Sequence, residues 1–97
     1  MATFIILGKF TKEGIANIKD LPNRAEAAKE VFKSVGADLK ETYYTLGQYD
    51  FVAIIEDASI EEITKALFII GSKGAVRTET LLAIKKDKVE DIIKKLP

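Results

Sequence analysis

The side chains with the clearest chemical potential are an arginine and a glutamate near the C-terminal third of the chain. Arg77 and Glu79 are two residues apart in a segment that alternates like a β-strand, so they share one face of it. A guanidinium withdrawn from water needs a carboxylate partner, which Glu79 or Glu41 could supply. Two interpretations follow: an ion pair that fixes the register of strands or subunits, or an anion-binding Arg77 in a pocket between subunits.

A second candidate centre is Asp50, which follows a glycine-containing turn and begins an apolar segment. One interpretation is turn chemistry, in which the carboxylate accepts local backbone N–H groups. The other is a general base that works with Tyr43, Tyr44 or Tyr49, because a phenol can give or take a proton without histidine. Tyrosines by themselves more often pack at cores and rims than catalyse.

Several kinds of site are disfavoured by what the chain lacks. It has no cysteine and no histidine, which removes disulfides, thiolate chemistry and the commonest metal ligands. We therefore expect no metal and no cofactor. The segments Gly8-Lys9 and Gly71–Gly74 do not have the spacing of a phosphate loop. With 15 basic and 15 acidic residues, the chain also lacks the positive excess that nucleic acid or an anionic membrane would attract.

The elements that would position these residues follow from hydrophobic periodicity and capping signals. Thr11 is expected to cap a helix that breaks near Pro22 and resumes to about Val35, while Ser59 and Glu62 form a capping box. The predicted strands are residues 2–10, 38–46, 50–57 and 75–84. The helix that starts at this capping box is expected to bury Ile60, Ile63, Leu67 and Ile70. Asp87 is expected to start a C-terminal helix over 87–96. The order is β-α-β-β-α-β, which predicts an α+β, ferredoxin-like fold with a four-stranded antiparallel sheet.

Two of the predicted strands, 2–10 and 50–57, are apolar on both faces. Such strands are central, and both of their faces need a cover. The helices can cover only one face of the sheet. A second copy of the sheet is the economical cover for the other, which predicts a homodimer or a multiple of dimers of the dimeric α/β-barrel type.

Length and composition indicate one domain that spans residues 1–97, with a core of 2–84 and a C-terminal helix. The first residues lack a basic leading segment, and no apolar run is long enough for a membrane span, so a cytoplasmic location is expected. Abundant lysine with little asparagine or glutamine is typical of thermophile proteins, and equally of an AT-rich genome.

Three segments together resemble the GYD domain family. They are the turn and strand Leu46–Ile54, the segment Arg77–Thr80, and the opening pattern Phe10–Lys19. The resemblance covers roughly residues 2–84 and leaves the C-terminal helix outside the family core. It implies a dimeric α/β barrel, and the family is largely described as of unknown function, so it brings no catalytic residues with it.

The function expected from these observations is a homo-oligomeric module that binds a small, anionic molecule. The candidate ligand-binding residues are polar positions on an otherwise apolar framework: Asn17, Tyr43, Tyr49, Asp50, Arg77 and Glu79. One alternative, by fold analogy alone, is a cofactor-free enzyme of the small monooxygenase or isomerase type. Another alternative is a structural or regulatory assembly protein without a small ligand.

Overall fold

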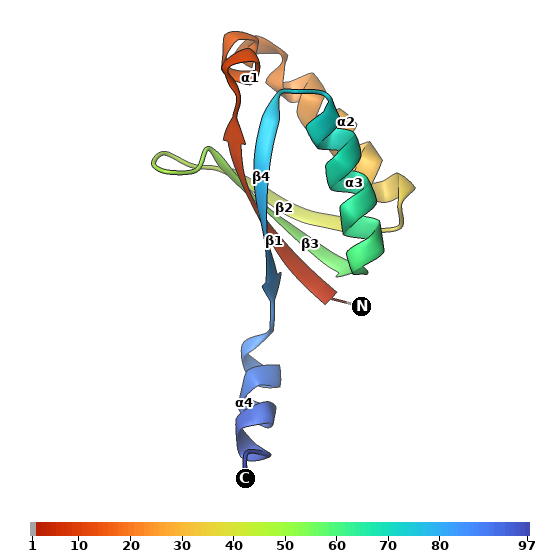
Figure 1. The fold of residues 1–97 in the computed structure, drawn as a ribbon, viewed down its shortest axis with the longest axis vertical. Coiled ribbons are helices and arrows are strands. Elements are labelled where there is room, and N and C mark those ends of the chain that lie inside the picture. The colour runs from red at the N-terminus through yellow and green to blue at the C-terminus, as the bar shows by residue number, and fades with distance from the viewer. Residues whose placement is uncertain (1) are drawn as a thin grey trace.

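Two long helices cover one face of a four-stranded antiparallel sheet in the computed structural model, which describes residues 2–97 (Figure 1). The strands lie in the order β2-β3-β1-β4, so β1 and β3 are central as predicted. The elements are β1 (Ala2–Phe10), α1 (Lys12–Ala16), the 3-10 helix η1 (Ile18–Asp20), α2 (Leu21–Ser34), β2 (Asp38–Tyr44), β3 (Phe51–Ala58), α3 (Ile60–Ser72), β4 (Val76–Ala83) and α4 (Lys86–Lys94). The predicted α+β class and element order are confirmed.

Most of the predicted helix boundaries are confirmed by capping contacts. Thr11 accepts a hydrogen bond from the backbone N–H of Gly14 at 3.1 Å. Ser59 and Glu62 form the reciprocal capping box of α3, with N···O distances of 2.8 and 3.1 Å. Gly36 follows α2 with φ +92°, a conformation that glycine adopts without steric cost.

Three boundary details differ from the prediction. The strand expected over 38–46 ends at Tyr44, because Thr45 closes the hairpin loop by donating its backbone N–H to the carbonyl of Asp50. Asp87 does not cap α4: the helix begins after Lys85, without a side-chain capping bond, and Lys86 pairs with Glu90. Ile60 is 72% exposed because it is the first residue of α3, and the buried face of that helix begins one turn later.

The core lies between the helices and the sheet. Ile6 on β1 and Ile55 on β3 are almost fully enclosed, at 2% and 0% exposure. The remaining buried core residues come from the same two layers and are Phe4, Phe32, Ala37, Ala53, Ala58, Ile63 and Ala66. This layer supplies the hydrophobic stabilisation of the single chain.

The opposite face of the sheet carries no helix from residues 2–97, and we call it the open face. Strand register aligns two apolar rows across it: Ile54, Ile5 and Leu81 in one, and Tyr43, Val52 and Leu7 in the other. The members on β1 and β3 are half-buried by their neighbours, whereas Leu81 is 43% and Tyr43 53% exposed. An apolar surface of this kind on one side of a sheet marks a site of contact with another molecule.

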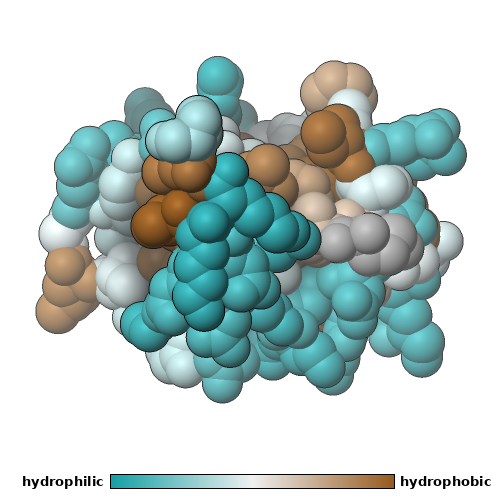
Figure 2. All heavy atoms as spheres, turned by 90° about the horizontal axis from the view of Figure 1, so that it is seen from below, coloured by the Kyte–Doolittle hydropathy of each residue, from teal (hydrophilic) through white to brown (hydrophobic). Residues whose placement is uncertain are grey.

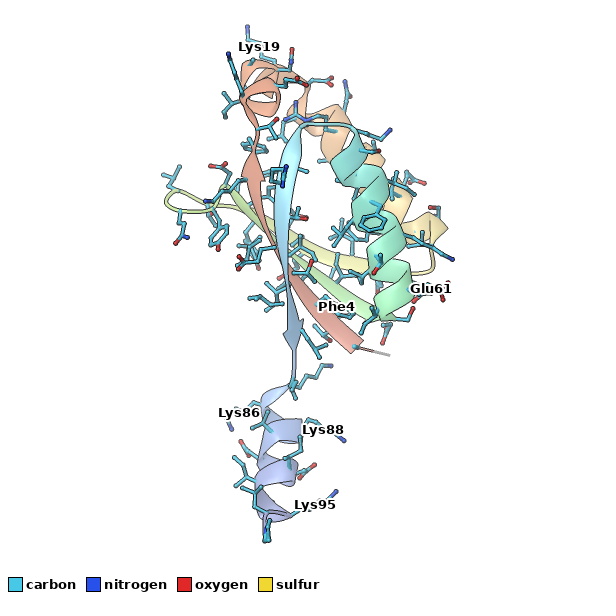
Figure 3. The ribbon with its side chains drawn as sticks, in the orientation of Figure 1. Phe4, Lys19, Glu61, Lys86, Lys88 and Lys95 are labelled. Carbon is cyan, nitrogen blue, oxygen red and sulfur yellow. The ribbon has the colours of Figure 1, made fainter. Side chains whose placement is uncertain are left out.

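Helix α4 extends from the end of β4 away from the two-layer body (Figure 1), which makes the chain 53 Å long by 30 × 18 Å. Lys86, Lys88 and Lys95 project around it (Figure 3). Its apolar side chains lie at helical spacing and are 37–57% exposed: Val89, Ile92 and Ile93; Leu96, just after the helix, is 64% exposed. Figure 2 views the molecule from below: hydrophobic side chains, in brown, lie beside the hydrophilic side chains, in teal, that are nearest the viewer.

Within residues 2–97, no helix is long and apolar enough to cross a membrane.

Candidate functional site: a cavity between the sheet and α2

A cavity of about 160 Å³ lies between the helix-covered face of the sheet and the helices. Its walls are mostly apolar and come from all four strands of the sheet, from α2 and from α3. The side chains that define its shape are Phe10 on β1, Ala25 and Ala28 on α2, Tyr44 on β2, Phe51 on β3 and Thr78 on β4.

The cavity exists because small side chains face the sheet at the start of α2. Ala25 and Ala28 stand where larger residues would reach the strands, whereas Val31 and Phe32 further along α2 pack against the core. On the sheet side, the ring of Phe51 lies over Gly8, and a Cβ added at Gly8 would come within 2.0 Å of it. The cavity is open to solvent on one side, since Thr42, Tyr44 and Thr78 in its lining are exposed, so a small molecule can enter it.

Two positive charges, Arg24 and Lys73, lie where this cavity meets a second, outer hollow. The guanidinium of Arg24 donates to the carbonyls of Asn17 and Gly14 at 2.7 and 3.1 Å. Its Cζ also lies 5.9 Å from the centre of the Phe10 ring. The outer hollow, of about 180 Å³, is lined by Glu13, Asn17 and Asp20 together with Arg24, Lys73 and Ala75. The two hollows are therefore adjacent and share both cations.

The six residues predicted from the sequence do not form one site. Asn17 lies at the outer hollow, where its Nδ2 donates to the carbonyl of Glu13 at 3.0 Å. Tyr49 and Glu79 meet on the open face, where the phenol donates to the carboxylate at 3.3 Å and the ammonium of Lys9 lies 5.5 Å from the Tyr49 ring. Tyr49 and Glu79 are thus brought together, but on the side of the sheet opposite the cavity.

Arg77 is exposed on the open face, opposite Lys9 in strand register. It takes part in none of the three ion pairs formed within residues 2–97. Within the single chain, Arg77 therefore forms no ion pair with Glu79 or Glu41, and a pair that fixes the register of subunits stays a prediction. The physical reason is that no element of the described chain covers this face, so water solvates the charge and no carboxylate is required.

Asp50 anchors the β2–β3 loop to β1, and its hydrogen bonds within residues 2–97 involve backbone groups and not a tyrosine side chain. Its carboxylate accepts the backbone N–H of Phe10 at 2.8 Å, and its own N–H donates to the carbonyl of Gly8 at 2.8 Å. The Asp50 carboxylate does accept a backbone N–H, but the donor lies 40 residues away, so the interpretation of a local contact within the turn is wrong. Tyr43 instead donates to Glu41 at 2.6 Å, and Tyr44 lines the cavity.

We expect Asp50→Ala to destabilise the fold by about 1.5–3 kcal/mol, because it leaves the Phe10 N–H without its charged acceptor. Asp50→Asn retains an acceptor oxygen and should cost clearly less. Chemical denaturation of the two variants beside the natural protein measures the difference. Equal losses for both variants would show that the hydrogen bond to Phe10 contributes little.

The two phenols of the open face, Tyr43 and Tyr49, should lose their protons at a higher pH than a free tyrosine does. Partial withdrawal from water, and then the Glu79 carboxylate, raise the pKa of Tyr49 above its usual value. The hydrogen bond to Glu41 raises the pKa of Tyr43. The folded state holds these protons more tightly than the unfolded state does. The protonated phenols therefore stabilise the fold fully below the unfolded pKa of about 10, and this stabilisation is lost as the pH rises through the folded pKa values.

Glu41→Gln should therefore shift one tyrosine titration toward lower pH, as measured by tyrosinate absorbance. Glu79→Gln should produce a smaller shift, because the main cause for Tyr49, its withdrawal from water, remains. If neither variant changes the titration curve, the two carboxylates do not contact the phenols in solution.

The cavity residues Arg24, Ala25, Ala28 and Lys73 were missed by the sequence analysis. The available signal was the cluster of alanines after Pro22, next to Arg24, one of only two arginines in the chain. Alanine favours helices at any position, so its presence on the inner side of α2 does not distinguish an empty volume from tight packing.

Comparison with known proteins identifies a family with this sequence pattern. The family description "GYD domain" matches residues 4–93. The chain belongs to the GYD domain family. The matched region of this GYD domain protein runs into α4, so it includes most of the helix that the resemblance had left outside the family core.

Two of the matches to this GYD domain protein, one to a curated protein and one to a solved structure, are from Thermus thermophilus. One is the "Glutamine synthetase and cystathionine beta-lyase binding protein", which is 34% identical over 97 residues, a match that covers 99% of each chain. The other is the crystal structure of TTHA0845, 30% identical with a TM-score of 0.56, which covers 88% of this chain and 95% of that one. A hypothetical protein from Pyrococcus horikoshii, PHS023, shares the fold at 19% identity and a TM-score of 0.56, with 89% and 93% covered.

Proposed function

We propose that this GYD domain protein is a homo-oligomeric module that binds a small molecule in the cavity between the sheet and α2. The observation that carries the proposal is the cavity itself, an apolar volume of about 160 Å³ that the chain's own side chains leave unfilled. Small-molecule sites are concave and mostly apolar, with a few polar groups that orient the ligand. Thr42, Tyr44 and Thr78 supply such groups here.

Self-association through the open face is part of the proposal. A second copy placed on this face by a two-fold axis would bury the rows that contain Leu7, Ile54 and Leu81. Burial of this apolar surface adds stability to a domain of this size, because its own core is small. Arg77 and Glu79 would then lie at or near the interface, where Arg77 could meet a carboxylate of the partner copy or a small anion held between subunits.

We also propose that the chain has two parts with different roles. Residues 2–84 form the folded core, and α4 is an extension whose apolar row packs on the second copy. The support is continuity: α4 follows directly from β4, the strand that carries Leu81. An amphipathic helix with no apolar contact of its own is otherwise only marginally stable in water.

Filling the cavity tests the binding proposal. In Ala28→Leu the larger side chain should occupy the space next to the sheet and weaken binding of any cavity ligand by about ten-fold or more, which is about 1.4 kcal/mol. Lys29→Leu is the matched control, because it places the same side chain on the exposed side of α2. A thermal-shift screen with a small-molecule library compares the three proteins.

Compounds that stabilise the natural protein and Lys29→Leu, but not Ala28→Leu, are the expected result. If every stabilising compound acts equally on Ala28→Leu, the ligand does not bind in this cavity and the proposal is wrong. Catalysis is not included in the proposal, because Asp50 does not line the cavity beside Tyr44.

A second candidate function is the binding of metabolic enzymes. It is favoured by the Thermus relative named for binding glutamine synthetase and cystathionine beta-lyase, which aligns with almost the whole chain. Sedimentation of the protein mixed with purified glutamine synthetase tests this function directly. A second mixture contains purified cystathionine beta-lyase. Co-sedimentation with either enzyme at micromolar concentration supports this function. If the protein sediments independently of the enzyme in both mixtures, the function is excluded.

A further inference from the structure

We infer that the cavity selects a ligand with an apolar body and one anionic group, such as a carboxylate, held by Arg24 and Lys73. This inference rests on the proposed function and adds the chemical class of the ligand. It places the apolar body between α2 and the sheet, and the anionic group where the cavity meets the outer hollow.

The charges that line the cavity have a single sign. Among residues 2–97, Arg24 and Lys73 are its only charged lining residues, and no acidic side chain contributes to its walls. The rest of the lining is hydrocarbon apart from Thr42, Tyr44 and Thr78. A cation placed there would meet two like charges, whereas an anion would gain two opposite charges in surroundings less polar than water.

Arg24 is held in place and still has donors to spare. Two of its N–H groups donate to the carbonyls of Asn17 and Gly14, and the guanidinium lies against the Phe10 ring. A guanidinium carries five N–H donors in a fixed plane, so the others remain for a ligand. Neither Arg24 nor Lys73 belongs to an ion pair within residues 2–97, so neither charge is already paired with a carboxylate of the described chain.

The outer hollow sets the orientation of the ligand. Glu13 and Asp20 line it together with the two cations, and the Asp20 carboxylate already accepts a hydrogen bond from Asn23 at 3.0 Å. Their negative charges repel an anion in the outer hollow, whereas no acidic residue lines the cavity within residues 2–97. The favourable position for the anionic group is therefore on the cavity side of Arg24 and Lys73.

Hexanoate, hexanol and hexylamine form a matched series that tests the inference, since they share an apolar body and differ in charge. Titrations followed by two-dimensional amide NMR report both affinity and the place of binding. We expect hexanoate to bind about ten-fold more tightly than hexanol, and hexylamine to bind more weakly than either. Lys73→Gln should reduce the advantage of hexanoate over hexanol several-fold, whereas Lys29→Gln, on the exposed side of α2, should leave it unchanged.

Arg24→Lys is the second variant, because it keeps the charge but not the planar fork, and it should also reduce the preference. Equal binding of hexanoate and hexanol, with both lost in Ala28→Leu, would overturn the anion preference and leave the proposed function intact. Preferred binding of hexylamine would overturn the inference in the same way. If none of the probes shifts cavity resonances, the proposed function fails together with the inference.

Discussion

Gly14→Ala is expected to destabilise the fold by about 1–3 kcal/mol, the range for forcing extra atoms into a packed site. A Cβ at Gly14 would lie 2.1 Å from the carbonyl oxygen of Ala75, which is backbone and cannot rotate away. That carbonyl also accepts the N–H of Thr11 at 3.0 Å, so relief of the clash separates α1 from the start of β4. Denaturant unfolding monitored by circular dichroism measures the loss.

Gly71→Ala is the matched control for this effect. Gly71 lies within α3, and a Cβ there meets no atom within 4 Å. Alanine is better than glycine in a helix by about 0.5–1 kcal/mol, so this variant should be slightly more stable than the natural protein. A Gly14→Ala variant as stable as the natural protein would show that α1 does not pack on Ala75 as described.

Leu81→Asp is expected to weaken self-association by about 100-fold or more. Leu81 lies in an apolar row of the open face, so a two-fold interface receives two new carboxylates, and unpaired or like charges there cost several kcal/mol. The monomer should remain folded, because Leu81 is 43% exposed in the single chain and contributes little to the core. Analytical ultracentrifugation over a range of concentrations gives the dissociation constants.

Ile60→Asp makes a comparable change away from the open face. Ile60 is 72% exposed at the first position of α3, where a negative charge is tolerated by the helix dipole. This control should associate like the natural protein. If Leu81→Asp also associates like the natural protein, the open face is not the interface.

The parts of the fold that could be predicted depend on local and periodic signals. Ser59 and Glu62 carry both halves of a capping box three residues apart, so the start of α3 can be read without knowledge of the rest of the chain. The two-sided apolar strands placed β1 and β3 in the centre of the sheet. Ile60 was misassigned because periodicity shows which side of a helix is apolar but not at which turn its burial begins.

The candidate site could not be predicted because it depends on contacts between distant segments. Asp50 has the sequence context of a turn residue, yet its partner is the N–H of Phe10, which only the pairing of the strands brings near. Ala28 and Lys73 come from distant parts of the chain and become neighbours of one cavity only after packing. Arg77 shares a strand face with Glu79, a spacing that is typical of an ion pair, but the folded chain leaves Arg77 exposed on the open face.

Native mass spectrometry after exposure to a small-molecule extract tests the binding account most directly. The natural protein should appear as a dimer or a multiple of dimers that carries extra mass, and Ala28→Leu should appear as the same oligomer without that mass. A natural protein that carries no ligand, or an Ala28→Leu variant that carries the same ligand, would contradict the claim that the cavity between the sheet and α2 is a binding site.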